Sequence, residues 1–156
     1  ELVDLATDRG VVDEPVSEID VYDVAREVAR RAERRSGRSI TVTDNGRNPV
    51  NGRLAQIQRA ITNLVDNAVK YSPDGTSIEI EVDGGHLRVR DHGPGIADAD
   101  LPHVFERFYR AIEARSAPGS GLGLSIVAQT VEQHGGTVFA GNHPDGGAVV
   151  GFDLPE

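Results

Sequence analysis

Hydrophobic residues recur at intervals of three and four in three stretches of the chain, the spacing that places them on one face of an α-helix. The first predicted helix begins after Asp20, a suitable N-cap, and ends at Gly37. The second spans residues 53–71 and the third spans residues 122–134. Gly135 follows the third directly and is typical of a helix C-cap. The pattern therefore predicts three amphipathic helices.

Alternation of apolar and polar residues, which is typical of half-buried strands, occurs between and after these helices. The predicted strands are 39–43, 77–82, 87–90, 137–140 and 148–154. Two of them flank Asp83-Gly84-Gly85, a turn signal that predicts a hairpin. Helices mixed with antiparallel hairpins favour an α+β protein. We expect a two-layer α/β sandwich, in which a mixed, mostly antiparallel sheet packs on the three helices.

Composition narrows the class of protein. The chain has 156 residues, which is room for one ordinary domain with a single core. Its 16 basic and 25 acidic residues give a net charge of −9, which argues against binding nucleic acid or an anionic membrane surface. It has no cysteine, which excludes disulfides, thiolate catalysis and a cysteine-built zinc site. No apolar run approaches the length of a bilayer helix.

The start of the chain suggests a piece of a longer protein. It begins at Glu1 and contains no methionine. We interpret residues 1–19 as the end of an upstream element followed by a linker, and residues 20–156 as the domain itself. All basic residues except Lys70 are arginines, and several fall together in the first predicted helix. We expect that arginine run to be a solvated helix face rather than a phosphate-binding surface.

Polar residues form a stripe on the second predicted helix. Asn63, Asn67 and Lys70 are spaced i, i+4 and i+7, so they share one side of the helix, away from its main apolar face. The amide oxygen of Asn suits Mg²⁺, and a lysine ammonium can meet a phosphate as a point charge. The stripe is either a solvated face or a site for an anion together with a hard cation, and we favour the site.

Two glycine-rich segments and one aromatic segment follow. Residues 91–96 (DHGPGI) place a carboxylate at a strand end, where Asp91 could accept a hydrogen bond from an exocyclic amine such as that of adenine. Residues 119–124 (GSGLGL) open the third helix and could give backbone N–H groups to an anion. Residues 105–110 (FERFYR) combine aromatic anchors with arginines. Each signal is weak alone, since turns and surface segments also produce it.

In this order the segments resemble the N, G1, F and G2 boxes of the catalytic, ATP-binding domain of bacterial two-component sensor histidine kinases. Residues 63–72 (NLVDNAVKYS) resemble the N box, and the three segments above resemble the others. The resemblance covers about residues 20–154. It implies a Bergerat-type (GHKL) sandwich that binds ATP and Mg²⁺ under a flexible lid, about residues 97–120. The arginine-rich composition is most similar to kinases of actinobacteria within this family.

The resemblance also implies a role for each matching residue. Asn67 corresponds to the magnesium ligand, with Asn63 nearby, and Lys70 to the phosphate-binding lysine. Tyr71 takes the place of an aromatic that stacks on adenine, and Asp91 that of the acceptor of the adenine amine. The catalytic residues would be Asn67, Lys70 and Arg107. The remaining nucleotide-binding positions would be Gly93, Gly95, Ile96, Phe105, Arg110, Gly119, Ser120, Gly121, Leu122, Gly123 and Leu124.

One position departs from the family pattern. The G1 box commonly has Asn after its Asp, and this chain has His92. We expect the His92 side chain to point away from adenine if Asp91 points towards it, with little effect on the fold.

Alternatives within the same fold stay open. The related ATPases carry a glutamate as general base one turn before the magnesium asparagine, where this chain has Asn63, and a neutral carboxamide cannot take a proton from water. That favours a histidine kinase, although a serine kinase of the anti-sigma-factor type and a nucleotide-binding module that transfers no phosphate remain possible.

The resemblance implies partners that the chain does not contain. A histidine kinase needs a phosphoacceptor histidine on a dimerising helical hairpin, and none of the five histidines has that sequence context. We expect the first residues to be the end of this hairpin, a response regulator as the final acceptor, and a membrane-anchored, homodimeric full-length sensor. The piece itself is expected to be cytoplasmic and monomeric, without direct membrane contact.

Overall fold

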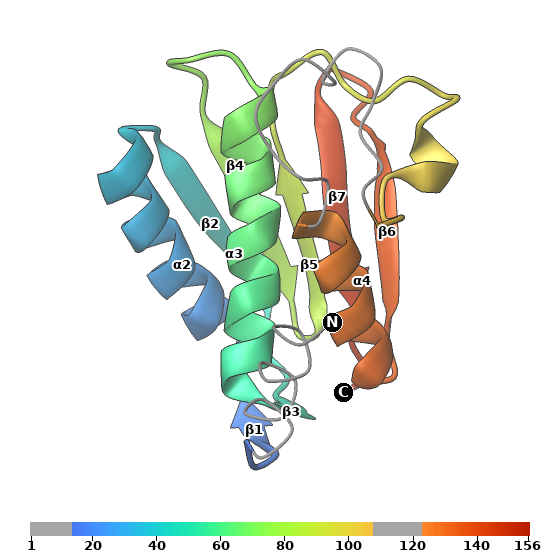
Figure 1. Cartoon of the computed structure of the whole chain (residues 1–156). Helices are drawn as coiled ribbons and strands as arrows, with labels where there is room; N and C mark the ends of the chain where they lie inside the picture. Colours follow the sequence, from blue (N-terminus) through green and yellow to red (C-terminus); the bar gives the residue numbers. More distant parts are fainter. Residues whose placement is uncertain (1–13, 108–122) are drawn as a thin grey trace, which may run out of the picture.

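Three helices lie on one face of a five-stranded sheet (Figure 1). The computed structural model describes residues 14–107 and 123–156. The helices are α2 (Val21–Ser36), α3 (Leu54–Tyr71) and α4 (Gly123–Gln133), and a short 3₁₀ turn, η1, spans Leu101–His103. The three predicted helices are therefore confirmed. Within the described ranges no helix has the length and hydropathy needed to cross a bilayer.

The large sheet has the strand order β2-β4-β5-β7-β6. Its strands are β2 (Ile40–Gly46), β4 (Ile78–Asp83), β5 (His86–Arg90), β6 (Thr137–Asn142) and β7 (Ala148–Asp153). Strands β2 and β4 are parallel, and every other neighbouring pair is antiparallel. The predicted α+β two-layer sandwich with a mixed, mostly antiparallel sheet is confirmed, and all five predicted strands are present.

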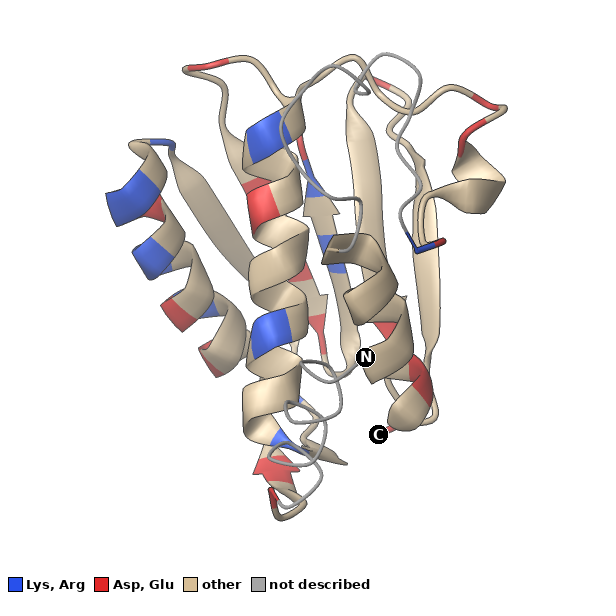
Figure 2. Ribbon diagram, in the orientation of Figure 1, with Lys and Arg blue, Asp and Glu red and all other residues tan. Residues whose placement is uncertain are grey.

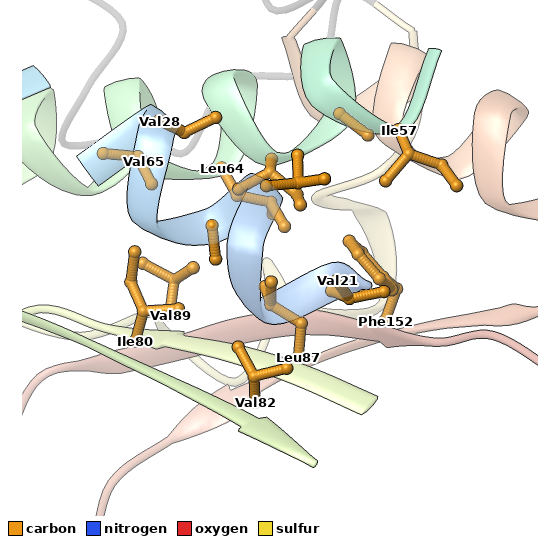
Figure 3. Packing of buried hydrophobic residues seen from close by; sticks show 14 of the residues in the cluster. Val21, Val28, Ile57, Leu64, Val65, Ile80, Val82, Leu87, Val89 and Phe152 are labelled. Atoms are coloured by element: carbon orange, nitrogen blue, oxygen red, sulfur yellow. The ribbon is translucent and has the colours of Figure 1, made fainter. Parts of the chain in front are cut away.

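Alternation along the strands decides which face is buried. Ile78, Ile80 and Val82 of β4 are buried, and so are Leu87 and Val89 of β5. Figure 3 shows Ile80, Val82, Leu87 and Val89 beneath apolar residues of the helices. The helix residues that cover them are buried at helical spacing; they include Val21, Val28, Ile57, Ile61, Leu64 and Val65. Burial of this single apolar layer is the main stabilising contribution to the fold.

Local hydrogen bonds fix the helix ends. Asp20 Oδ1 accepts a hydrogen bond from Tyr22 N at 3.0 Å, as expected of an N-cap. At the end of α4, His134 Nδ1 lies 2.7 Å from Thr130 O, and His134 Nε2 accepts a hydrogen bond from Arg53 N at 3.1 Å. His134 therefore joins the end of α4 to the start of α3, a role that its position at a helix terminus did not predict.

A second, two-stranded sheet was not predicted. β1 (Ser17–Ile19) pairs antiparallel with β3 (Val50–Gly52), and Figure 1 shows both beside the beginning of α3. Strands of three residues are too short for alternation to mark them. Because β1 lies within residues 1–19, part of the segment interpreted as a linker belongs to the folded domain. Residues 1–13 lie outside the described residues.

The arginine-rich face of α2 is exposed, and Figure 2 shows the basic residues along that helix. Arg30 and Arg31 form ion pairs with Glu27 one turn earlier. Arg35 forms an ion pair with Asp66 of α3 at 2.6 Å. The prediction of a solvated helix face is confirmed.

Candidate functional site

Among the described residues, those predicted for the base and for the phosphates lie on three neighbouring segments, two of which meet at one end of the sandwich. The carboxyl end of α3 and the segment after β5 lie there, near the turn between β6 and β7, and the beginning of α4 lies beside the middle of α3 (Figure 1). Asn63 Nδ2 donates a hydrogen bond to Gly123 O at 3.4 Å. That contact places the first residue of α4 beside the polar stripe of α3. The structure therefore joins the N box to the end of the G2 box.

The polar stripe of α3 is open to ligands. Asn63 and Asn67 are half-buried, and Lys70 is exposed. Lys70 Nζ lies 5.1 Å from the centre of the Tyr71 ring, a cation–π distance. No other described residue forms a hydrogen bond with the Asn67 side chain. Its amide oxygen is a hard donor that is free to coordinate a cation.

The donor set fits a magnesium ion that arrives with a phosphate ligand. Among the described residues no group of three or more His, Cys, Asp or Glu side chains could hold a metal. Mg²⁺ is usually held by one or two protein oxygens together with the phosphates of a nucleotide, rather than by an all-protein cage. The residues present therefore fit Mg²⁺ as part of a nucleotide complex.

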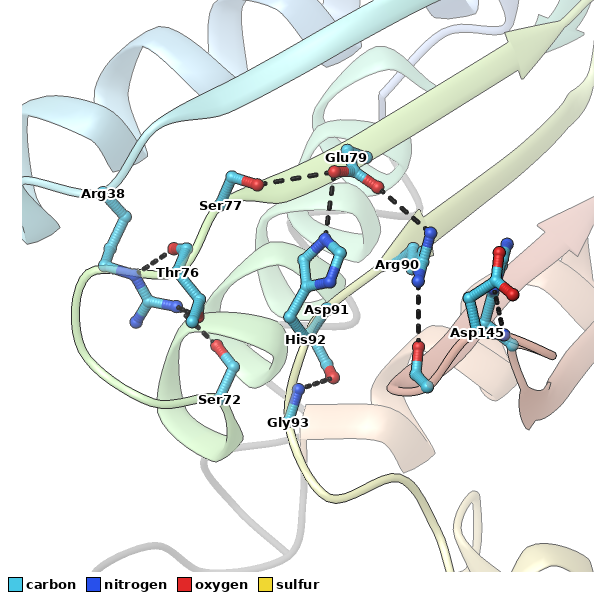
Figure 4. Close-up of polar contacts among 12 residues, drawn as sticks. Arg38, Ser72, Thr76, Ser77, Glu79, Arg90, Asp91, His92, Gly93 and Asp145 are labelled. Atoms are coloured by element: carbon cyan, nitrogen blue, oxygen red, sulfur yellow. Dashed lines mark hydrogen bonds and ion pairs between the residues drawn. The ribbon is translucent and has the colours of Figure 1, made fainter.

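Asp91 is the buried acid of the site, with 6% of its surface exposed. Its Oδ1 atom accepts hydrogen bonds from Gly93 N at 2.9 Å and from Ala148 N at 3.1 Å (Figure 4 shows the first). Asp91 N donates in turn to Ala148 O at 3.0 Å. Within the described ranges Oδ2 has no partner, so one oxygen fixes the carboxylate and the other can accept a hydrogen bond from a ligand.

Both glycines of the G1 segment are required by contacts inside the protein. A Cβ atom at Gly93 would lie 2.6 Å from Tyr71 O, so α3 and this segment touch backbone to backbone. Gly95 has a φ of 82°, in the left-handed region, and a Cβ atom there would lie 2.7 Å from Asn142 Oδ1. The expectation that these glycines let a base approach stays a prediction, but the structure gives each an independent reason to be glycine.

The end of β6 and the turn between β6 and β7 contribute residues that the sequence did not predict. Asn142 Oδ1 accepts from Ile96 N at 2.7 Å, and Asn142 Nδ2 donates to Ile96 O at 2.8 Å. Gly147 has a φ of 87°, and a Cβ atom there would lie 1.9 Å from Asp91 O. Only the Gly146-Gly147 pair could have hinted at such close packing in the sequence.

The His92 side chain points towards Glu79 of β4; that it points away from adenine stays a prediction. His92 Nε2 lies 3.0 Å from Glu79 Oε2, and Arg90 Nη1 lies 3.7 Å from Glu79 Oε1 (Figure 4). The hydrogen bond with His92 is the main reason why the pKa of Glu79 is lowered below its usual value, and the charge of Arg90 adds to it. Through these contacts Glu79 connects β4 to Arg90 at the end of β5 and to His92 in the G1 segment.

The F and G2 segments are described only in part. Phe105 is partly buried against the hydrophobic core, as are Ile96 and Leu124, which agrees with the expected anchoring role of Phe105. Arg107 is exposed at the end of the described range. Outside the described residues lie Arg110, Gly119, Ser120, Gly121 and Leu122.

The first part of the expected lid forms hydrogen-bonded turns. Asp100 N donates to Ala97 O at 2.8 Å, and Glu106 N donates to His103 O at 2.9 Å. Asp100 is buried. The expected lid, 97–120, continues beyond the described residues, and its opening and closing stay a prediction.

The chain was compared with known proteins. The family model described as "Histidine kinase-, DNA gyrase B-, and HSP90-like ATPase" matches residues 52–156. Over 157 residues the chain is 45% identical to the signal transduction histidine-protein kinase/phosphatase MprB of Mycobacterium sp. (strain KMS). This match covers 92% of the chain and 30% of the relative, so the chain spans about a third of the relative's length.

Solved structures of histidine kinases are also similar to this chain. A mycobacterial sensor histidine kinase MprB is 36% identical, with a TM-score of 0.78, over 89% of this chain and 96% of that chain. The ATP-binding domain of PrrB from Mycobacterium tuberculosis is 27% identical, with a TM-score of 0.72, over 91% of this chain and 98% of that chain. The expected similarity to kinases of actinobacteria is confirmed by the matches to MprB and PrrB.

The contact between Glu79 and His92 predicts a pH effect on stability. Because the pKa of Glu79 is lowered in the folded protein, its stabilising contribution is complete above the usual glutamate value of 4.5 and is lost as the pH falls through the folded-state pKa. Replacing Glu79→Gln should therefore flatten the acid side of the stability curve. Urea unfolding between about pH 3 and pH 7 measures this.

The matched control is Glu81→Gln, two residues along the same strand and exposed on the same face. This variant should keep the wild-type acid dependence. If Glu79→Gln lost as much stability in acid as the wild type, the assignment of this contribution to Glu79 would be wrong.

Proposed function

Because the chain belongs to the family of histidine kinase-, DNA gyrase B- and HSP90-like ATPases, we propose that it is the ATP-binding catalytic domain of a sensor histidine kinase. In this proposal it binds Mg-ATP and donates the γ-phosphate to a histidine on a separate dimerisation domain, for relay to a response regulator. The similarity to MprB, a signal transduction histidine-protein kinase/phosphatase, supports this choice within the family.

The carboxylate of Asp91 is the observation that carries the proposal. It is buried, one of its oxygens is held by two backbone N–H groups, and the other has no partner within the described ranges. An acceptor fixed in this way suits the exocyclic amine of adenine. Guanine presents a carbonyl oxygen at that position, which would leave two acceptors opposed.

The stripe on α3 supplies the phosphate end of the same site. We assign Asn67 as the protein ligand of Mg²⁺ and Lys70 as a point charge for phosphate oxygens. The beginning of α4 lies beside Asn63, and the positive end of its helix dipole favours a negatively charged ligand. When bound, Mg²⁺ neutralises phosphate charge and so assists transfer. Lys70, the amino end of α4 and the two arginines assigned to phosphate, Arg107 and Arg110, then provide local positive charge in a domain of net charge −9.

Asn63 favours transfer to a protein over hydrolysis. Its amide donates to Gly123 O and carries no proton-accepting charge, so it cannot act as a general base for water. An ATPase of this family would need a carboxylate there. This residue supports the kinase over the ATPase alternative.

The acceptor is proposed to lie on another domain. The five histidines are His86, His92, His103, His134 and His143, and each is engaged locally, with Asp153, Glu79, Glu106, Thr130 and Asp145 respectively. We propose that the acceptor hairpin precedes this domain in a homodimeric, membrane-anchored sensor whose kinase domain faces the cytoplasm. The domain alone is proposed to be a monomer.

Asp91→Asn tests the adenine assignment. Asn can still accept both backbone hydrogen bonds through its oxygen, but it places an NH₂ donor where Oδ2 faces the ligand. We expect ATP affinity to fall by at least about tenfold, and wild-type protein to bind ATP far more tightly than GTP. Calorimetric titration measures both.

The matched control is Asp23→Asn, on the exposed side of α2, which should bind ATP like the wild type. Equal wild-type affinities for ATP and GTP, or an unaffected Asp91→Asn variant, would show that the carboxylate does not read the base.

Phosphoryl transfer tests the proposed activity itself. The domain is mixed with a separately produced hairpin domain of the same full-length protein and labelled ATP, and acid-labile phosphohistidine is measured. Asn67→Asp adds a negative charge beside the phosphates, and Lys70→Ala removes a positive one, so each should slow transfer by at least about tenfold. Asn51→Asp, exposed on β3, is the control and should transfer at the wild-type rate. Wild-type rates in both site variants would contradict the assignment.

A further inference from the structure

Arg38 is a buried charged residue outside the site described so far, with 6% of its surface exposed. It precedes β2, yet all its side-chain hydrogen bonds reach the end of α3 and the turn that follows. Arg38 Nη1 donates to Val69 O at 3.3 Å, and Nη2 donates to Ser72 Oγ at 2.6 Å. Nε donates to Thr76 O at 2.7 Å, and Nη2 also donates to Thr76 Oγ1 at 2.7 Å (Figure 4).

A buried guanidinium is costly without partners, and among the described residues no carboxylate is paired with Arg38. Its partners are instead carbonyl and hydroxyl oxygens at the carboxyl end of a helix, where unpaired carbonyls and the helix dipole concentrate negative charge. Ser72 Oγ itself donates to Ala68 O at 2.7 Å. The guanidinium therefore satisfies the last turn of α3 directly and through one hydroxyl.

The turn that Arg38 holds is the one that carries the ligand-facing residues. Lys70 and Tyr71 lie between Val69 and Ser72, both of which bond to Arg38. The same turn touches the G1 segment, because a Cβ atom at Gly93 would lie 2.6 Å from Tyr71 O and 3.2 Å from Ser72 Cα. A shift of this turn would change the spacing between Lys70 and Asp91.

We propose that Arg38 is a positioning residue for the nucleotide site, which holds the end of α3 so that Lys70 and Tyr71 face the ligand at a fixed distance from Asp91. This inference rests on the proposed function as a nucleotide-binding domain. The planar guanidinium, with several donors in one rigid fork, is needed because the acceptors lie on three residues. A lysine keeps the charge but cannot reach all of them together.

A purely structural role and a positioning role predict different results. If Arg38 only stabilised the fold, its replacement would lower the melting temperature and leave the affinity of the folded protein unchanged. If it positions the site, affinity falls more than stability alone explains. The variant is Arg38→Lys, with two controls: Arg34→Lys on the exposed face of α2, and Val82→Ala, a buried change near the far end of β4.

Three quantities are measured: the dissociation constant for Mg-ADP, the melting temperature, and amide hydrogen exchange of residues 69–76 without nucleotide. We expect Arg38→Lys to bind Mg-ADP at least about tenfold more weakly and to exchange faster in 69–76. Val82→Ala should melt at a lower temperature but bind Mg-ADP like the wild type, and Arg34→Lys should change none of the three quantities. Should Arg38→Lys fail to fold, Ser72→Ala removes one acceptor and is expected to weaken binding about threefold.

The outcomes separate this inference from the function on which it rests. Wild-type affinity in Arg38→Lys, or in Ser72→Ala if that variant is needed, would overturn the positioning role and leave the proposed function intact. An equal loss of affinity in Val82→Ala would also overturn it, because destabilisation alone would then explain the effect. If the wild-type domain itself did not bind Mg-ADP, the proposed function and this inference would both fall.

Discussion

One carboxylate oxygen sets the geometry of the whole site. Asp91 Oδ1 accepts from Gly93 N and from Ala148 N, while Asp91 N donates to Ala148 O. Asp91 therefore extends the pairing of β5 with β7 by one residue and then turns the chain back on itself. Because two backbone donors fix one oxygen, the direction of the other is fixed as well. A buried acid held in this way offers a ligand one acceptor at a defined place.

Two further contacts keep the neighbouring elements in register with that acceptor. The Asn142 side chain pairs with both backbone groups of Ile96, which fixes the end of the G1 segment on the β6–β7 side. Arg38 fixes the end of α3 on the opposite side of Asp91. The candidate site is thus supported largely by side chains that bond to backbone groups, some of them in β7 and α3 and others in the G1 segment and in the turn after α3. The polar stripe of α3 itself stays open to a ligand.

Local patterns predicted most of the fold because they report burial. The three helices and five principal strands follow from periodic apolar positions whose burial the structure confirms. The pattern did not predict β1 and β3, because each has only three residues and is recognised only by its pairing with the other. The parallel pairing of β2 with β4 across α3 is likewise a property of the packed chain rather than of any segment.

The residues proposed to face the ligand were predicted for a different reason: the chemistry of Asn67, Lys70 and Asp91 is visible in the residue types and their spacing. The supporting residues were not. Asn142 bonds to backbone 46 positions away, and Arg38 bonds to Ser72 34 positions away, so nothing near either residue in the sequence points to its partner. The contact of His134 with the amide of Arg53 was not predicted for the same reason. Residues that position a site through backbone contacts become visible only in the folded chain.

The central claim is that an adenine nucleotide binds between the end of α3 and Asp91. The most direct measurement is a titration of ¹⁵N-labelled protein with Mg-ADP, followed through backbone amide chemical shifts. The largest shifts are expected at residues 67–71, at 91–96 and at Ala148, whose amide bonds to Asp91. The amides of Arg30, Arg31, Arg34 and Arg35 on the exposed face of α2 should barely move. Shifts centred on α2 or on the β1–β3 sheet, with 91–96 unchanged, would contradict it.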